Sequence, residues 1–134
     1  MTKRLILPSL LAVMACSKTE TTMPTKQDAS IHILDSAAME ILDPETKLEV
    51  LSTGHSWSEG PLWLEKEQTL LFTDIPNNAI FQVKDGQSSI YLQPSGYTGT
   101  TQRGGEVGAN GLTLDPQGRL VLCQHGDRRM ARMD

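Results

Sequence analysis

From Lys47 onward the chain alternates between short apolar segments and clusters of turn-forming residues. The apolar segments are four or five residues long, rich in Leu, Ile, Val and Phe, and separated mostly by Asn, Asp, Gly or Pro. Segments of this kind are typical of β-strands. The pattern predicts strands over 47–51, 61–64, 69–73, 79–83 and 89–92. The last four are close enough in sequence to form a four-stranded antiparallel meander.

The apolar pattern of this meander recurs fifty positions later with no gap. Leu62 aligns with Leu112, and the segment 70–72 aligns with 120–122. A period of about 40 to 50 residues with four short strands per unit is typical of a β-propeller blade. We therefore predict an all-β fold of the β-propeller class, containing an N-terminal strand, the first blade and most of the second. An unrelated β-sandwich is the alternative.

The second unit reaches only its third predicted strand at Asp134. A propeller closes by radial repetition of blades, so these units would not close a ring and would leave strand edges unpaired. We expect residues 31–134 to be the N-terminal part of a truncated propeller. A truncated reading frame without function is a competing interpretation.

A short helix is expected ahead of the strands. Asp35 can cap a helix over 36–42, and Pro44 prevents its continuation. Met39 and Leu42 give the helix a small apolar stripe, so we expect it to pack on the larger body.

The first fifteen residues have the pattern of an export signal. Lys3 and Arg4 precede an apolar run over 5–15 that is too short to span a bilayer. The segment 13–16 resembles the lipobox of bacterial lipoproteins, which implies lipidation of Cys16. An ordinary cleaved signal is the alternative.

Residues 16–30 are polar and lack apolar periodicity, so they would form a lipid-anchored tether. These features predict an exported lipoprotein of the bacterial cell envelope, periplasmic and anchored in the outer membrane. The formal net charge of −4 argues against a nucleic-acid partner.

Polar side chains gather at one end of the two repeated units, because alternate loops of a meander lie at the same end. The residues expected there are Glu59, Asp74, Asn77, Asn110, His125, Asp127 and Arg128. Oxygen donors of this kind suit a hard or borderline divalent cation.

The same stretch carries the motifs WSEGPLW, LLFTDIPNN, PSGYTG, RGGE and NGLTLDPQGRLVLCQHGDRR. In combination these resemble the family of senescence marker protein (regucalcin), gluconolactonase and the luciferin-regenerating enzyme. The resemblance runs from about Leu34 to Asp134. It implies a six-bladed propeller with one divalent metal ion in its channel, and hydrolysis of sugar lactones.

The resemblance also implies roles for single residues. Glu59 stands at the position of a metal ligand, and Asn110 and His125 stand at positions that line the lactone pocket. The remaining ligands, an Asn and an Asp that is also the general base, would lie beyond Asp134. The ion could be calcium, zinc, magnesium or manganese, acting as a Lewis acid on the lactone carbonyl and holding the attacking water.

Each candidate also has a structural interpretation. Glu59 could be an exposed loop carboxylate, Asn110 a turn residue and His125 a loop-packing residue. Asp74 could contact the substrate or bind nearby backbone amides. The working hypothesis is a metal-dependent lactonase that this chain alone cannot complete. A non-catalytic envelope propeller that binds a ligand or partner is the alternative.

Overall fold

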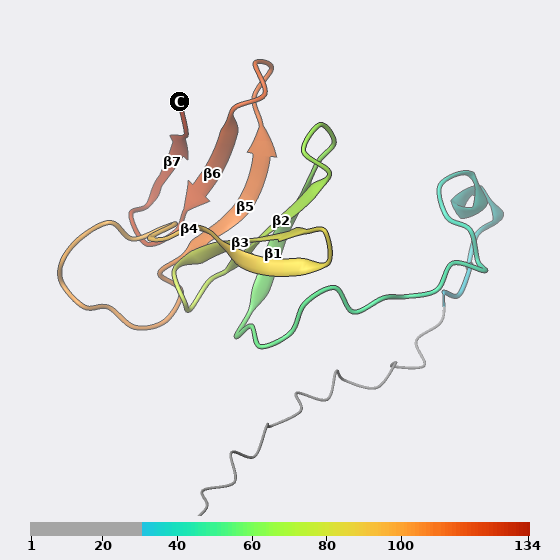
Figure 1. Ribbon diagram of the computed structural model, residues 1–134, viewed down its shortest axis with the longest axis horizontal. Helices are drawn as coiled ribbons and strands as arrows, with labels where there is room; N and C mark the ends of the chain where they lie inside the picture. Colours follow the sequence, from blue (N-terminus) through green and yellow to red (C-terminus); the bar gives the residue numbers. More distant parts are fainter. Residues whose placement is uncertain (1–30) are drawn as a thin grey trace, which may run out of the picture.

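The computed structural model describes residues 31–134, which form two antiparallel β-sheets and one short 3-10 helix (Figure 1). The predicted signal over 1–15 and the tether over 16–30, including Cys16, lie outside the described residues. Within the described range, no helix has the length and hydropathy of a membrane span.

The first sheet is the predicted meander, with strand order β1-β2-β3-β4. Its strands are β1 (Ser58–Leu64), β2 (Thr69–Asp74), β3 (Ala79–Lys84) and β4 (Gln87–Leu92). β2 has a neighbour on both sides and is the most buried strand, with Leu71, Thr73 and Asp74 fully buried. The four-stranded prediction is confirmed.

The second sheet has the order β5-β6-β7. Its strands are β5 (Ala109–Leu114), β6 (Leu120–Gln124) and β7 (Arg129–Arg132). The turn before β7 repeats the turn before β3, since Asn78 and Arg128 have φ of 52° and 56°. The two turns are therefore the same structure in successive units.

The sequence predicted a repeat without gaps, and this prediction is wrong. Ser58 pairs with Asp74, and Ala109 pairs with Gln124, so the first strands are fifty-one positions apart and the second strands fifty. The hairpin of the second unit is one residue shorter, since 15 residues separate Ser58 from Asp74 and 14 separate Ala109 from Gln124. Asn110 therefore occupies in the second sheet the position that Glu59 occupies in the first.

The core lies between the two sheets. Leu71 and Ile80 of the first sheet contact Ala109, Leu120 and Leu122 of the second, and all five are buried. One face of the first sheet is thus covered by the second, as in neighbouring propeller blades. The all-β propeller prediction accounts for this packing.

The predicted strand over 47–51 is wrong. This segment has no strand partner, and Leu48, Val50 and Leu51 are each about half exposed. Alternation of polar and apolar residues produces a strand only where a neighbouring strand accepts its backbone hydrogen bonds.

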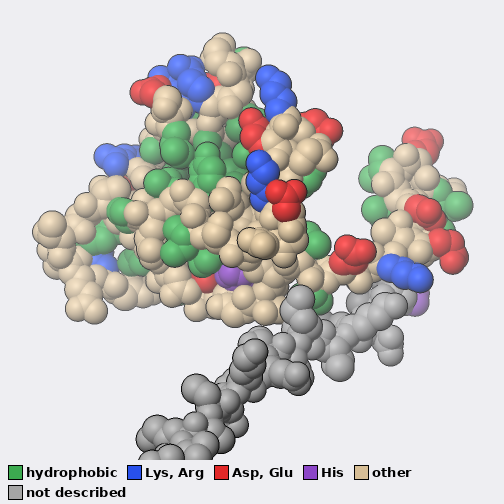
Figure 2. Space-filling view, in the orientation of Figure 1, with side chains coloured by type: hydrophobic (Ala, Val, Ile, Leu, Met, Phe, Trp, Pro, Cys, Tyr) green, Lys and Arg blue, Asp and Glu red, His purple; other side chains and the backbone are tan. Residues whose placement is uncertain are grey.

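The predicted helix exists in a shorter form. Asp35 caps it as expected, its Oδ1 accepting a hydrogen bond from the amide of Ala37 at 2.9 Å, but the helix is a 3-10 helix over Ser36–Glu40. It does not pack on the sheets as expected. None of its residues is buried, and this segment stands apart from the sheets with hydrophobic side chains at its surface (Figure 2). Met39 in the helix is 60% exposed.

Candidate functional site

The first strands of the two sheets meet at the position where Glu59 and Asn110 lie. The backbone of Gly60 packs so closely on β5 that an added Cβ would lie 2.3 Å from the carbonyl oxygen of Asn110. Thr73, the strand partner of Glu59, donates its hydroxyl to the same carbonyl oxygen at 3.0 Å. We call this meeting point of Glu59, Gly60, Thr73 and Asn110 the β1–β5 corner.

Glu59 is half-buried at this corner. Among the contacts of residues 31–134, none is a hydrogen bond or an ion pair of its carboxylate. A carboxylate in this state has lone pairs available to a cation or to a donor from a ligand. The structure therefore leaves Glu59 free for the metal-ligand role, which stays a prediction.

Asp74 is fully buried at the end of β2. Its Oδ2 accepts the amide of Ser56 at 3.0 Å and the Nδ2 of Asn77 at 2.8 Å, and its Oδ1 accepts the amide of Trp57 at 3.2 Å. Burial by itself raises the pKa of Asp74, but these hydrogen bonds and the nearby His55 bring the pKa below its usual value. These contacts correspond to the structural interpretation of Asp74, and substrate contact stays a prediction.

His125 lies beside a polar cavity of about 400 Å³. Its Nδ1 is 3.3 Å from the Oε2 of Glu106, and both side chains are partly exposed. Arg103, Arg128 and Val107 also line the cavity, and Val107 is only three residues ahead of Asn110. The cavity therefore lies next to the segment that leads into β5. His125 lines this cavity, and its contact with a lactone stays a prediction.

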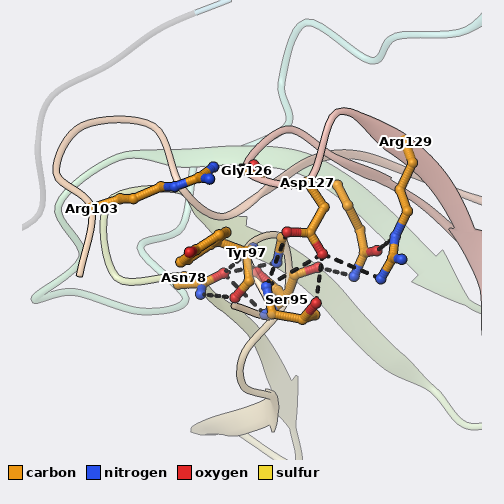
Figure 3. A network of polar contacts seen from close by, with 10 residues as sticks. Asn78, Ser95, Tyr97, Arg103, Gly126, Asp127 and Arg129 are labelled. Atoms are coloured by element: carbon orange, nitrogen blue, oxygen red, sulfur yellow. Dashed lines mark hydrogen bonds and ion pairs between the residues drawn. The ribbon is translucent and has the colours of Figure 1, made fainter. Parts of the chain in front are cut away.

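Asp127 forms structural contacts, whereas Arg128 lines the His125 cavity. Asp127 accepts the Thr98 hydroxyl at 2.6 Å and pairs with the Nη2 of Arg129 at 3.2 Å (Figure 3). The hydrogen bond from Thr98 is the main cause of a lowered pKa for Asp127. Arg128 is exposed in the turn before β7.

Sequence reasoning missed Asn78, which organises the long connection after β4 (Figure 3). Its Oδ1 accepts three consecutive backbone amides, those of Ser95, Gly96 and Tyr97, at 3.1, 2.7 and 3.2 Å. Its Nδ2 donates to the carbonyl oxygen of Tyr97 at 2.8 Å. The only signal in the sequence was the second Asn of the Pro-Asn-Asn turn.

The same connection ties the two sheets together. The hydroxyl oxygen of Ser95 accepts the amide of Ala109 at 3.0 Å, and the Nε2 of Gln124 donates to the Ser95 carbonyl at 3.1 Å. Arg103 lies over the Tyr97 ring, 4.1 Å from its centroid, and donates to the carbonyl of Gly126 at 3.1 Å. These contacts hold the wall of the His125 cavity against the second sheet.

The described residues provide only part of a metal site. No group of three His, Cys, Asp or Glu side chains comes together between residues 31 and 134. The Glu59 carboxylate and the Asn110 amide are oxygen donors of the type that calcium and magnesium bind, but these ions take about six or more ligands. The donor chemistry fits a divalent cation, and further donors would be required.

Residues 57–134, more than half of the chain, match the SMP-30/Gluconolactonase/LRE-like region. This chain belongs to that family. It is 36% identical over 97 residues to a gluconolactonase of Zymomonas mobilis subsp. mobilis, covering 70% of this chain and 27% of that protein.

Solved structures agree with this assignment. A gluconolactonase from Xanthomonas campestris superposes with a TM-score of 0.51 and 32% identity over 63% of this chain and 25% of its own. A structural-genomics structure assigned to the gluconolactonases gives 0.50 and 31% over 62% and 25%. The family prediction is confirmed, and the chain spans about a quarter of the length of these relatives.

Proposed function

We propose that this chain forms part of a metal-dependent hydrolase of sugar lactones. The observation that carries the proposal is the β1–β5 corner, which places an unpaired carboxylate beside an amide residue on the adjoining strand. The gluconolactonase relatives make a lactone the first substrate class to test.

In this proposal Glu59 holds one divalent cation, which could be calcium, zinc, magnesium or manganese. The bound ion supplies Lewis-acid polarisation of the lactone carbonyl. Asn110 and His125 donate or accept hydrogen bonds with the sugar hydroxyls, which orients the ring.

The reaction adds water to the ring ester and opens it to the aldonic acid. An acidic product releases a proton at neutral pH, so turnover can be followed directly by titration. Removal of the proton from the attacking water requires a general base. We propose that the base, and the remaining metal ligands, come from other blades of a longer protein.

We expect the Glu59→Gln variant, expressed in the source organism, to need more metal than the parent protein. The metal concentration for half-maximal gluconolactone hydrolysis should rise at least about tenfold. The amide keeps the side chain's size and loses its negative charge, which calcium-type sites depend on. The measurement is proton release after EDTA treatment and titration with each divalent ion.

Glu67→Gln is the matched control. Glu67 is exposed in the turn between β1 and β2, at the other end of the same hairpin, so its substitution should leave the metal dependence unchanged. Equal metal dependence of the Glu59→Gln and parent proteins would contradict the ligand role. No hydrolysis of any sugar lactone by the parent would favour the non-catalytic propeller instead.

A further inference from the structure

We infer that Asp74 is a positioning residue for Glu59, which fixes the segment leading into β1 and thereby the direction of the Glu59 side chain. The inference rests on the proposed function only for what Glu59 binds. The positioning itself follows from the contacts of Asp74.

The carboxylate of Asp74 holds the two residues that immediately precede β1. Its two oxygens accept the amides of Ser56 and Trp57, and Asn77 bridges Asp74 to the Ser56 hydroxyl at 3.1 Å. The carbonyl of Trp57 accepts the amide of Ile75 at 3.2 Å, so Trp57 is held through both its amide and its carbonyl. Glu59 follows two residues later, at the start of the β1–β5 corner.

We call the hydrogen bonds of Asp74 with Ser56 and Trp57 the Asp74 clamp. In the part of the chain that the structure describes, the second sheet has no equivalent of this clamp. Gln124 replaces Asp74 at the equivalent position and forms different contacts: it donates to Ser95 and accepts from Arg129. The segment leading into β5 is held from the first sheet instead. Gly108 donates its amide to the Ile75 carbonyl at 2.8 Å, and Ala109 donates to Ser95. β5 thus needs no carboxylate of its own, whereas β1 has Asp74.

His55 extends the clamp by one residue. Its ring packs edge-on against Phe72 and Phe81, with centroids 4.7 and 4.6 Å away, and its Nε2 lies 2.6 Å from the Ser52 hydroxyl. Its Nδ1 lies 3.8 Å from the Oδ2 of Asp74. The segment from Ser52 to Trp57 is therefore fixed by ring packing at one end and by the Asp74 carboxylate at the other.

The burial of Asp74 separates positioning from substrate contact. Its side chain has no exposed surface, and both oxygens already accept hydrogen bonds. Oδ1 has one lone pair left, but the side chain is buried, so a substrate hydroxyl could reach it only if the residues that cover it moved. The carboxylate therefore acts through the backbone of Ser56 and Trp57.

Asp74→Asn tests this directly by amide hydrogen exchange on the chain. Asn keeps the volume but presents one acceptor oxygen and an NH2 group, so at least one of the two amides loses its partner. We expect exchange at Ser56 and Trp57 to accelerate at least about tenfold relative to amides of β2 and β3. Asp127→Asn is the matched control, because it removes an amide-binding carboxylate from the second sheet and should affect Thr98 instead.

Unchanged exchange at Ser56 and Trp57, or an equal acceleration throughout the first sheet, would overturn the inference. Should Asp74→Asn fail to fold by circular dichroism, Asn77→Ala decides by the same readout. It removes one donor from the same carboxylate and should accelerate the two amides selectively, by about threefold.

A second readout separates this inference from the proposed function. If the parent protein hydrolyses gluconolactone, its Asp74→Asn variant should need at least about a tenfold higher metal concentration for half-maximal activity. The KM for the lactone at saturating metal should change little. A raised KM with unchanged metal dependence would show substrate contact and overturn positioning. An inactive parent protein would refute the lactonase proposal, while the exchange pattern still decides the role of Asp74.

Discussion

Gly60→Ala is expected to lower the free energy of unfolding by about 2 to 5 kcal/mol, combining a backbone cost of about 1 to 2 with overpacking of about 1 to 3 kcal/mol. Gly60 has φ of 51°, where a Cβ is unfavourable. The added atom would also lie 2.3 Å from the Asn110 carbonyl oxygen and 3.2 Å from the Leu112 amide nitrogen. Both neighbours are backbone atoms, so relief requires the two sheets to separate.

Gly86→Ala isolates the backbone cost. Gly86 has φ of 72° in the turn between β3 and β4, and an added Cβ would have no atom within 4 Å. Its loss should be about 1 to 2 kcal/mol. Denaturant unfolding of both variants measures the difference, and equal losses would contradict the close contact between β1 and β5.

Asn78→Ala is expected to cost about 3 kcal/mol, since four hydrogen bonds disappear at about 1 kcal/mol each and part of the exposed backbone can bind water instead. The buried amide of Gly96 would lose its acceptor, whereas the buried amide of Ser95 would keep the backbone carbonyl of residue 78 at 2.9 Å. The Ser95 segment also joins the sheets, so the loss should appear as well in exchange at Ala109.

Asp85→Ala controls for the backbone at this second site. Asp85 has φ of 50°, close to the 52° of Asn78, but it is exposed in a hairpin turn. It should cost about 1 kcal/mol. A loss for Asn78→Ala no greater than that for Asp85→Ala, by the same denaturant measurement, would refute the role of Asn78 as the organiser of the connection.

Most of the strands were predictable because each carries its own apolar residues between turn residues. Period-two burial and turn chemistry are local properties, and they gave β2 and β3 to within one residue, whereas β1 and β4 begin three and two residues earlier than predicted. Pairing is not local. The segment 47–51 has a strand pattern but no partner, and the shortening of the second hairpin by one residue became visible only from the pairing of Ala109 with Gln124.

The site was predictable in part, for the same reason. Glu59 and Asn110 could be named from motifs, but their meeting depends on the packing of one sheet on the other. Asp74 was correctly suspected of binding backbone amides, and its partners lie 17 and 18 residues earlier in the chain. Arg103 and Glu106 stood out only as the ends of the RGGE motif, because their roles come from contacts with Tyr97, Gly126 and His125.

The contacts between the sheets also serve the candidate site. Ser95 and Gln124 fix the connection to the second sheet, and Thr73 fixes Asn110 to the first. Substitution of Thr73, Ser95 or Gln124 is therefore expected to alter both the stability of the protein and the relative placement of Glu59 and Asn110.

The most direct test of the β1–β5 corner as a cation site is a titration of the 15N-labelled chain with Mn²⁺, followed by paramagnetic broadening of its amide signals. Oxygen donors bind this ion, and broadening detects even weak binding by an incomplete ligand set. We predict that the amides of 58–60 and 110–111 broaden first and that Glu59→Gln abolishes the effect. Broadening confined to the acidic turn 65–67, or unchanged in Glu59→Gln, would contradict the site.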